Sequence, residues 1–537
     1  MRPSVKIRKI RSIMLTLFIS TFFSLTTGCM KSIESPEDKN VERPPNIILI
    51  VTDDMGYGDI SPYGNPTART PNFERMAQEG QKWTNFYVAS PICTPSRAAI
   101  LTGRLPVRLD LREDRERQVF FEDSTNGLQP SEVTIAEILK SVGYATAAIG
   151  KWHLGHLPQF LPTSQGFDSY FGIPYSNDMD APGGLITPWK SQRNKDPSLV
   201  KIDLMREGAN IDHWDVPLMN NEVVIERPAD QWTLTQRYTE KAIEFIKNKR
   251  EQPFFLYLAH SFPHIPLFAG ENFWGKNAGG YYADVIEELD HSTGQIMESL
   301  ESLGLDNDTL VIFTSDNGPW IGMMEFGGSA GALRGGKGST YEGGMRVPGL
   351  FWGPGHIVPG VHTGIGSTLD LLPTIAFFAN AVLPDDRTID GVNLAGSLTQ
   401  GKVSPRETVH FYRGEKDTML PQENSHTANI VASSESGTNS RKLRQKLYAI
   451  RHGSFKLHFR SKGSFGVPDD GRNVISGPDY SDWGMDKKTI RHHNPPLLFN
   501  LDSDPGERYD VSANHPNVLR ALKVLADAHT ETISETR

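Results

Sequence analysis

The sequence predicts an α/β protein in which helices sandwich a large, mostly parallel or mixed sheet, followed by a smaller C-terminal antiparallel sheet with a helix. Four apolar runs that each end in a polar cluster predict the central strands of the large sheet. Their apolar residues are continuous rather than alternating, which is typical of strands that helices cover on both faces. The chain has 537 residues, of which 38% are hydrophobic, and this length favours one large domain plus a smaller one.

Helical segments separate the four apolar runs, and we expect helices over 134–141 and 235–247, for example. Because open α/β sheets gather their sites beyond the carboxyl ends of the strands, we expect the polar clusters to converge at one edge. The runs and the polar residues that follow them are 46–52 with Asp53 and Asp54, 144–149 with Lys151 and His153, 254–259 with His260 and His264, and 310–314 with Asp316 and Asn317.

The composition and the pattern of apolar residues change after about residue 400. Three short runs predict the strands of the smaller antiparallel sheet, and a helix is expected to close the chain. A stretch poor in apolar residues predicts an exposed insertion or long loop. We therefore expect a larger domain over 46–400 and a smaller C-terminal subdomain over 401–537. The strands are expected at 447–450, 455–459 and 497–500, the closing helix at 517–533, and the polar insertion near 414–445.

The N-terminal leader predicts export. Residues 1–28 carry five basic residues and no acidic one, and their apolar run is short for a transmembrane helix. The pair Gly28-Cys29 resembles a bacterial lipoprotein cleavage site, although Thr26 stands where Leu is usual, and ordinary secretion or a simple N-terminal anchor are the alternatives. We expect a signal peptide over 1–28, lipidation of Cys29 and a tether over 29–45, giving a periplasmic or membrane-anchored bacterial lipoprotein.

The net charge of the chain indicates which classes of ligand it can bind. The formal net charge is -9, and removal of the basic leader makes the remaining chain more acidic still. Nucleic-acid binding is not expected, because phosphate contacts depend on clustered Lys and Arg. An anionic substrate must instead be attracted by a locally positive pocket.

The chain has only two cysteines, Cys29 and Cys93, so no disulfide framework is expected. Cys93 opens the sequence Cys-Thr-Pro-Ser-Arg97, in which Pro95 suits the first turn of a helix that stops at Gly103. The N–H groups and dipole at a helix N-terminus favour an anion there. From this pattern alone, Cys93 is either a catalytic thiol of lowered pKa or a buried, inert cysteine.

Oxygen donors at two strand ends predict a metal site. Asp53, Asp54 and Asp316 offer carboxylates and Asn317 offers an amide oxygen, whereas no Cys or His cluster has the spacing of a zinc site. Such hard donors suit Ca²⁺ or Mg²⁺, and an irregular cage of protein oxygens leans toward Ca²⁺. The alternative is that Asp53-Asp54 is only a polar turn, which the second strand ending in Asp-Asn disfavours.

Several of these segments together resemble the type I sulfatases. In that family the cysteine of the first signature is oxidised after translation to formylglycine by a maturation enzyme, and calcium is bound. The resemblance implies an alkaline phosphatase-like fold, and within the family it is similar to the arylsulfatase A and N-acetylgalactosamine-6-sulfatase groups. The segments that carry it are Cys93–Arg97 with Leu101–Arg104, Gly150–Gly155, Gln165–Asp168, Gly172–Ser176, Leu333–Gly338 and Tyr341–Arg346.

The resemblance also implies the roles of individual residues in hydrolysing a sulfated carbohydrate or an aryl sulfate. The metal ligands would be Asp53, Asp54, Asp316, Asn317 and modified Cys93. The catalytic residues would be Cys93, Arg97, Lys151, His153, His264 and Lys337, and the sulfate contacts would be Lys151, Ser176, His264 and Lys337. The family pattern fixes His264 rather than His260, and His156, His492 and His493 are weaker candidates for substrate contacts.

Two other functions remain open from the sequence. A phosphoesterase of the same superfamily is one, although such enzymes often combine a Ser or Thr nucleophile with zinc-ligating histidines, which these motifs lack. The other is a lipoprotein that binds sulfated glycans without cleaving them, which would require Cys93 to remain a thiol. The oligomeric state and the identity of the sulfate ester are not readable from the sequence.

Overall fold

The computed structural model describes residues 43–111, 117–180, 210–416, 443–465 and 490–535. The expected signal peptide, Cys29 and most of the tether and of the polar insertion lie outside these ranges. Everything described below belongs to one unit, Pro44–Arg537. Within the described ranges, no helix combines the length and the apolar character needed to cross a membrane.

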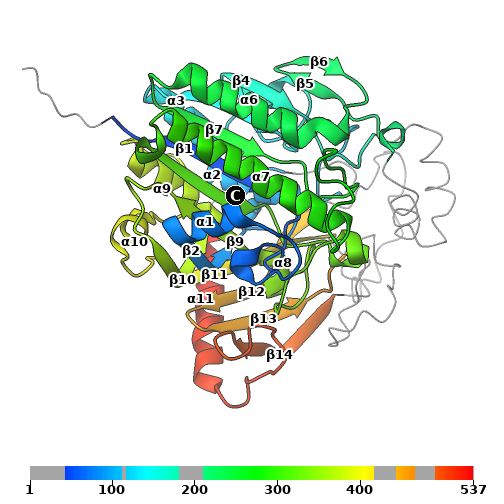
Figure 1. The fold of residues 1–537 in the computed structure, drawn as a ribbon. Helices are drawn as coiled ribbons and strands as arrows, with labels where there is room; N and C mark the ends of the chain where they lie inside the picture. Colours follow the sequence, from blue (N-terminus) through cyan, green and yellow to red (C-terminus); the bar gives the residue numbers. More distant parts are fainter. Residues whose placement is uncertain (1–42, 112–116, 181–209, 417–442, 466–489, 536–537) are drawn as a thin grey trace, which may run out of the picture. The chain divides into compact units, whose positions relative to one another are not determined.

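A mixed ten-stranded sheet forms the larger part of the fold, as the sequence predicts (Figure 1). The strands at its centre are parallel, whereas β9 runs antiparallel to both its neighbours and β4, β5 and β6 pair antiparallel. In spatial order they are β10 (Gly360–Ser367), β2 (Gln81–Tyr87), β9 (Arg346–Trp352), β8 (Thr309–Ser315), β1 (Asn46–Thr52), β7 (Phe254–Ala259), β3 (Ala145–Gly150), β4 (Ser169–Gly172), β5 (Leu218–Asn220) and β6 (Val223–Glu226). The four predicted central strands are β1, β3, β7 and β8.

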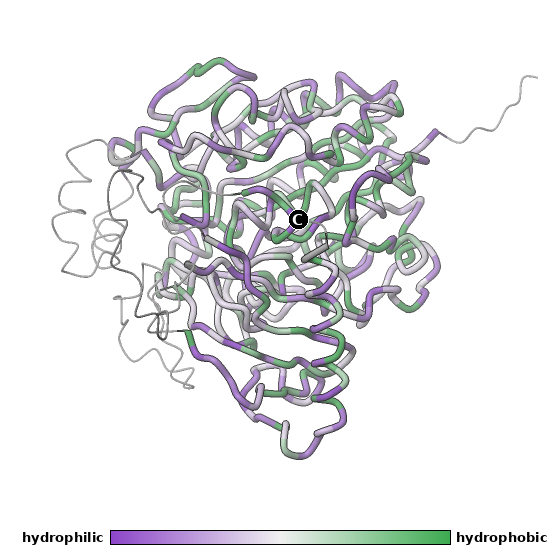
Figure 2. The backbone as a smooth tube through the Cα atoms, turned by 180° about the vertical axis from the view of Figure 1, so that it is seen from behind, coloured by the Kyte–Doolittle hydropathy of each residue, from purple (hydrophilic) through white to green (hydrophobic). Residues whose placement is uncertain are grey.

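Helices cover both faces of this sheet, which explains why its central strands are apolar throughout. In β1, Ile48 and Ile50 belong to the core on one face, whereas Ile47, Leu49 and Val51 belong to the core on the other. Figure 2 shows hydrophobic segments running through the interior of the same backbone. The first face is packed by α1 (Pro71–Glu79), α6 (Leu234–Lys249) and α7 (Tyr281–Ser302), and the second by α2 (Cys93–Thr102), α3 (Ile135–Ser141), α9 (Leu371–Phe378) and α10 (Ala395–Gln400).

Two helices begin and end where their sequences dictate. Thr134 caps α3 by accepting a hydrogen bond from the Glu137 N–H, and the Glu137 carboxylate accepts one from the Thr134 N–H. Helix α2 starts at Cys93 itself and ends at Gly103, whose φ of 64° is left-handed. The short 3₁₀ helices are Ser61–Tyr63, Pro106–Arg108, Pro158–Phe160, Pro162–Ser164, Ile211–His213, Gln231–Thr233, Asp306–Asp308, Ile321–Phe326 and Thr368–Asp370.

The C-terminal part is a four-stranded antiparallel sheet with a closing helix, which confirms the second half of the predicted fold class. Leu522 and Ala526 of the helix pack on Ile450, Leu457 and Leu498 of the sheet. The strands extend further than the sequence predicts, because their outer ends carry polar residues. They are β11 (Thr408–Lys416), β12 (Leu443–His452), β13 (Phe455–Ser461) and β14 (Arg491–Asn500), and the helix is α11 (Pro516–Glu535).

A buried charge network joins the two sheets. Lys456 on β13 lies 2.9 Å from Glu342, in the short helix α8 (Glu342–Met345), and 3.0 Å from Glu507, and all three side chains are fully buried. Glu507 also accepts a 2.7 Å hydrogen bond from His458. Burial alone would raise the pKa of Glu342, but the charges of Lys456 and Arg346 hold it well below its ordinary value. Lys456 therefore pairs with two carboxylates at the junction of the sheets, and Arg346 supplies a second cation to Glu342.

We predict that Lys456→Ala lowers the free energy of unfolding by about 3–5 kcal/mol, because it leaves two buried carboxylates without their shared cation. Urea unfolding measures the change. The matched control is Lys523→Ala, which removes an exposed pair with Asp527 and should change stability by less than about 0.5 kcal/mol. Equal effects of the two substitutions would contradict the prediction.

Candidate active site

The polar clusters that follow β1, β3, β7 and β8 meet at the carboxyl edge of the large sheet, as predicted. These strands are neighbours in the order β8-β1-β7-β3. The Asp54 N–H donates to the Asp316 carboxylate at 3.2 Å, and the Lys151 N–H donates to the Ala259 carbonyl at 2.7 Å. The Asp53 N–H donates to the Phe262 carbonyl at 3.1 Å. The sheet register therefore fixes the backbone on which the candidate side chains stand.

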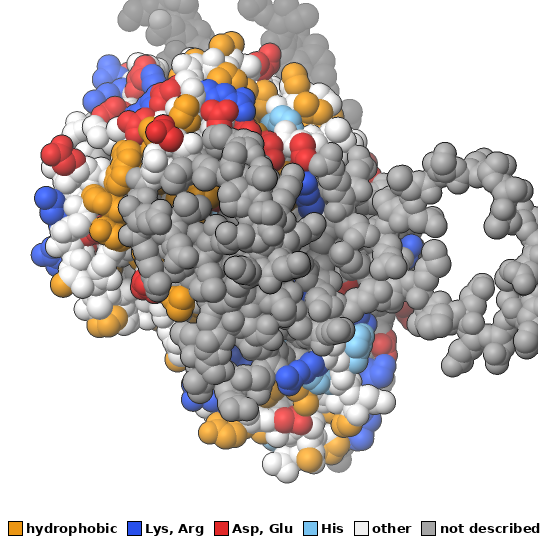
Figure 3. Space-filling model, turned by 90° about the vertical axis from the view of Figure 1, so that its right-hand side faces the viewer, with side chains coloured by type: hydrophobic (Ala, Val, Ile, Leu, Met, Phe, Trp, Pro, Cys, Tyr) orange, Lys and Arg blue, Asp and Glu red, His pale blue; other side chains and the backbone are white. Residues whose placement is uncertain are grey.

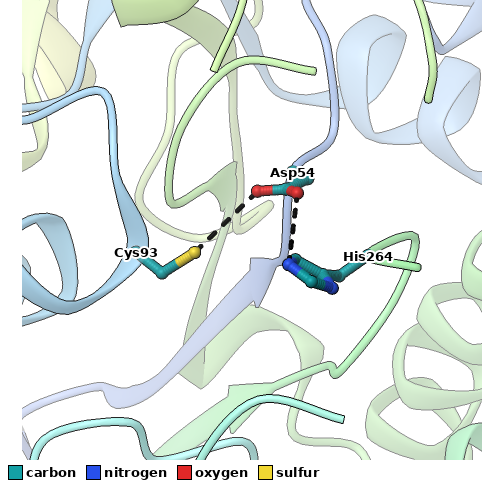
Figure 4. Close-up of side chains that lie close together, drawn as sticks. All are labelled: Asp54, Cys93 and His264. Carbon is teal, nitrogen blue, oxygen red and sulfur yellow. Dashed lines mark hydrogen bonds and ion pairs between the residues drawn. The ribbon is translucent and has the colours of Figure 1, made fainter. Parts of the chain in front are cut away.

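Cys93 projects into this edge from the first position of α2. Its thiol donates to Asp53 Oδ1 at 3.4 Å and lies 3.9 Å from Asp54 Oδ1, while His264 approaches Asp54 from another direction (Figure 4). Burial raises the pKa of the Cys93 thiol well above its ordinary value, and the charges of Lys151 and Lys337 do not offset this. A thiol that stays protonated is a weak nucleophile, so the geometry disfavours an ordinary catalytic cysteine.

Four donor groups at the centre of the site could hold a metal ion. One ligand atom each from Asp53, Asp54, Asp316 and Cys93 lie within 4.8 Å of one another, and all four residues are buried. Asn317 donates from Nδ2 to Asp54 at 2.7 Å, and its buried Oδ1 has no hydrogen-bond partner in the described part of the chain. Burial and the neighbouring Asp53 raise the pKa of Asp316 to about 7. A hard divalent cation fits this set, since it would satisfy Asn317 Oδ1 and offset the crowded carboxylates.

Three buried cations face these carboxylates. Lys151 forms an ion pair with Asp53. Lys337 Nζ lies 2.7 Å from Asp54 Oδ2, and Arg97 Nε lies 2.8 Å from Asp316 Oδ2. The three carboxylates and three cations balance in formal charge, so a bound divalent cation would leave the site net positive and attractive to an anion.

Other polar groups stand beside these cations. Lys151 Nζ donates to Ser176 Oγ at 3.0 Å, and Lys337 Nζ lies 4.7 Å from the centre of the Trp320 ring. Arg97 Nη1 donates to the Lys151 carbonyl at 3.0 Å, which ties the helix of Cys93 to the loop after β3. On the face drawn in Figure 3, basic and acidic side chains are interspersed among the coloured residues.

His153 is held as a neutral base. Its backbone φ of 59° is left-handed, and its Nε2 lies 2.9 Å from the Phe120 carbonyl. Since a carbonyl can only accept, Nε2 carries the hydrogen and Nδ1 keeps the lone pair. This buried Nδ1 has no hydrogen-bond partner among the described residues. Burial, with the charges of Lys151 and Arg97, lowers the pKa of His153 well below its ordinary value. Nδ1 is thus available to take a proton.

His264 is oriented in the opposite sense. Its Nδ1 donates to the Ile265 carbonyl at 2.5 Å, and its Nε2 lies 3.5 Å from Asp54 Oδ2. Burial and the charge of Lys337 lower its pKa, while Asp54 and Asp53 oppose that shift. Nε2 is therefore the nitrogen that faces the centre of the site.

The structure brings all the main candidates together but leaves the weaker histidines outside. His260 is buried against α7, with Nε2 3.4 Å from Ser292, and burial lowers its pKa to about 3. His493 contacts Ser461 on β13 at 2.9 Å, and His156 packs against Tyr175. These contacts are made with Ser292, Ser461 and Tyr175 rather than with the carboxylates of the site, and His492 lies on β14 opposite Arg460 of β13.

Sequence reasoning missed two groups that shape the site. Phe120 acts through its backbone carbonyl, which no side-chain pattern could reveal. Thr94 donates to the His153 carbonyl at 2.9 Å and accepts from the Phe120 N–H at 3.3 Å, so it links the helix of Cys93 to both. Its position beside Cys93 was the only available signal.

Two family models together match most of the chain. A family model described as "Sulfatase" matches residues 45–381, and one described as "C-terminal region of aryl-sulfatase" matches residues 404–537. The chain is 39% identical to arylsulfatase A of Homo sapiens over 498 residues, which cover 90% of this chain and 87% of that protein. It is 36% identical to N-acetylgalactosamine-6-sulfatase of Homo sapiens over 502 residues, which cover 91% and 86%.

A solved structure shares the architecture. The crystal structure of Ps i-CgsB in complex with k-i-k-neocarrahexaose matches with a TM-score of 0.66 and 28% sequence identity, covering 90% of this chain and 92% of that chain. The likeness therefore spans both sheets of the present fold.

We predict that adding Ca²⁺ to chelator-treated protein raises the thermal midpoint, because a ligand that binds only the folded state stabilises it by mass action. Asp316→Asn should abolish this increment by removing one carboxylate of the candidate metal site. Asp527→Asn, at an exposed ion pair of α11, should leave it intact. An Asp316→Asn protein that gains as much from Ca²⁺ as the wild type would exclude this metal site.

Proposed function

We propose that this chain, which belongs to the sulfatase family and is therefore a sulfuric ester hydrolase, removes sulfate from a sulfated carbohydrate by means of a formylglycine formed from Cys93 and a bound divalent cation. Aryl sulfates would serve as artificial substrates. The carbohydrate class is supported by the name of one relative, an N-acetylgalactosamine-6-sulfatase, and by the oligosaccharide complex of the structural neighbour.

The position of Cys93 carries the proposal. As a thiol it is buried, has a raised pKa and is enclosed by Asp53 and Asp54, so it is poorly suited to attack an ester. Formylglycine hydrates to a geminal diol, which supplies one hydroxyl to attack sulfur and a second whose deprotonation lets sulfate leave by elimination. A diol is neutral and donates hydrogen bonds, which suits a position between two carboxylates. A maturation enzyme would be required to oxidise Cys93.

The metal would be held by Asp53, Asp54, Asp316 and Asn317 together with residue 93, and Ca²⁺ is favoured over Mg²⁺ by this cage of protein oxygens. When bound, the cation supplies Lewis-acid stabilisation of negative charge on the reacting oxygens. Arg97 would keep Asp316 and Asp53 in place, since it is 2.8 Å from the first and 3.5 Å from the second.

The remaining residues would bind the sulfate group or transfer protons. Lys151, Ser176, His264 and Lys337 would form the anion-binding side of the site and hold the sulfuryl oxygens. His153 would accept the proton of the residue 93 hydroxyl at Nδ1, the nitrogen left without a partner. Lys337 would donate to the departing oxygen, and His264 in its protonated form would donate to the same oxygen from Nε2, the nitrogen that faces Asp54.

The predicted domains and location accompany this proposal. We propose a sulfatase catalytic domain over 46–400 and a C-terminal subdomain over 401–537, preceded by a signal peptide over 1–28 and a tether over 29–45. Lipidation of Cys29 would anchor the exported protein to a membrane surface. Mass spectrometry of the mature N-terminus tests this point separately from catalysis.

We predict that purified protein hydrolyses a sulfate monoester faster than the matched phosphate monoester, and that Cys93→Ala abolishes turnover while leaving the fold intact. Kinetics on both esters, circular dichroism and mass spectrometry of the peptide spanning Cys93 test the proposal. Faster phosphate turnover would favour a phosphoesterase. An unmodified thiol in active protein, or wild-type activity in Cys93→Ala, would exclude formylglycine catalysis.

We predict that His153→Asn lowers kcat by about 10²- to 10⁴-fold, the usual contribution of a general base. Asn tolerates the left-handed backbone at this position, so the local fold is retained while the base is lost. His156→Asn, three residues away and outside the cluster, is the control and should change kcat less than about threefold. A His153→Asn enzyme as active as this control would remove His153 from the proton transfer.

A further inference from the structure

We propose that Arg413, on β11 of the C-terminal sheet, is a positioning residue for Lys337 and thus shapes the anion-binding side of the site. The inference rests on the role proposed above for Lys337. The C-terminal sheet thereby contributes to catalysis, although its strands lie far along the sequence from the site residues.

The backbone around Lys337 is held by four hydrogen bonds from four separate segments. The Lys337 N–H donates to the Pro319 carbonyl at 2.8 Å, and the Gly338 N–H donates to the Pro91 carbonyl at 2.9 Å. These two bonds come from segments that also carry Asn317 and Cys93. The Phe465 N–H donates to the Lys337 carbonyl at 2.9 Å. Arg413 Nε donates to the Gly338 carbonyl at 2.6 Å, so the C-terminal part supplies half of this frame.

The environment of Arg413 indicates that its placement is costly. Arg413 is 1% exposed, no ion pair joins it to a carboxylate in the described ranges, and its buried Nη2 has no hydrogen-bond partner there. Burying a cation without a counter-ion costs several kcal/mol. The short bond to Gly338, a 3.4 Å bond from Nη1 to the Gly414 carbonyl and the Phe465 ring, 5.9 Å away, offset part of this cost.

Phe465 closes the same turn from the other side. Gly338 has a φ of +83°, and a Cβ placed there would lie 2.9 Å from the Phe465 ring. Gly336, one residue before Lys337, donates to Ser464 at 2.6 Å. The turn is therefore clamped between Arg413 and the segment that follows β13.

This clamp determines where the Lys337 ammonium lies. From the fixed turn, the side chain crosses the Trp320 ring at 4.7 Å and reaches Asp54 at 2.7 Å. A shift of about 1 Å at a positioned catalytic group can cost on the order of 10²-fold in rate. Loss of Arg413 would release the Gly338 carbonyl, which is one residue from Lys337. We therefore expect the Lys337 ammonium to shift by about this distance.

A double-mutant cycle between Arg413→Met and Lys337→Ala tests the inference. Met keeps the apolar stem of Arg413 and removes its donors. We expect Arg413→Met to lower kcat/KM for an aryl sulfate by about 10- to 100-fold and to raise the inhibition constant of inorganic sulfate, since the anion-binding side is displaced. Arg413→Lys, which keeps the charge and one donor, should recover part of the loss. In the Lys337→Ala background, Arg413→Met should have no further effect.

The control is Arg406→Met, which removes a half-buried arginine of the C-terminal part. Arg406 pairs with Asp370 rather than with the Lys337 turn. Its substitution should lower the thermal midpoint. Any fold loss in kcat/KM that Arg406→Met causes should be the same in the wild-type and in the Lys337→Ala background. Two results would overturn the inference. One is a fold loss in kcat/KM from Arg413→Met that is the same with and without Lys337. The other is an unchanged inhibition constant of sulfate in a folded Arg413→Met protein. A wild-type protein without activity on any sulfate ester would instead overturn the proposed function.

Discussion

The adjoining ends of β1 and β8 place three carboxylates in one buried space, and the remainder of the site is arranged around this concentration of negative charge. Asp53, Asp54 and Asp316 are each matched by a buried cation. The three cations come from α2, from the loop after β3 and from the loop after β8, so elements remote in sequence are tied to one point. Removing any one cation would leave the buried carboxylates in excess over the cations, which is strongly destabilising.

A second buried charge network extends this constraint to the smaller sheet. The segment from Lys337 to α8 reaches both networks, since Lys337 pairs with Asp54 and Glu342 pairs with Lys456. Lys456 also donates to the Thr340 carbonyl at 2.9 Å, between these two points. One short segment is therefore fixed by the large sheet at one end and by the C-terminal sheet at the other, and a change in either sheet acts on the geometry of the same lysine.

The sequence predicts the parts of this structure that follow from local pattern. Continuous apolar runs identify β1, β3, β7 and β8, and the polar residues that follow them identify most of the site, because parallel strands end at a common edge. Seven strands were not predicted: β2, β4, β5, β6, β9, β10 and β11. Burial in β9 comes from antiparallel pairing with strands more than 30 residues away in sequence. Lys456 and Arg413 were missed because they break the rule that charged side chains lie at the surface. Their partners, Glu342 and Gly338, lie more than 70 residues away.

The same carboxylates explain why an unmodified cysteine is a poor fit at position 93. A thiolate there would stand 3.4 Å from Asp53 and 3.9 Å from Asp54, and the negative charges of Asp53 and Asp316 add to burial in raising the thiol pKa. A group surrounded by metal-binding carboxylates must either be neutral or itself bind the metal cation. A hydrated aldehyde meets the first condition, since its two hydroxyls can donate to oxygens that would repel a thiolate. The carboxylates proposed to hold the metal therefore also disfavour thiolate chemistry at position 93.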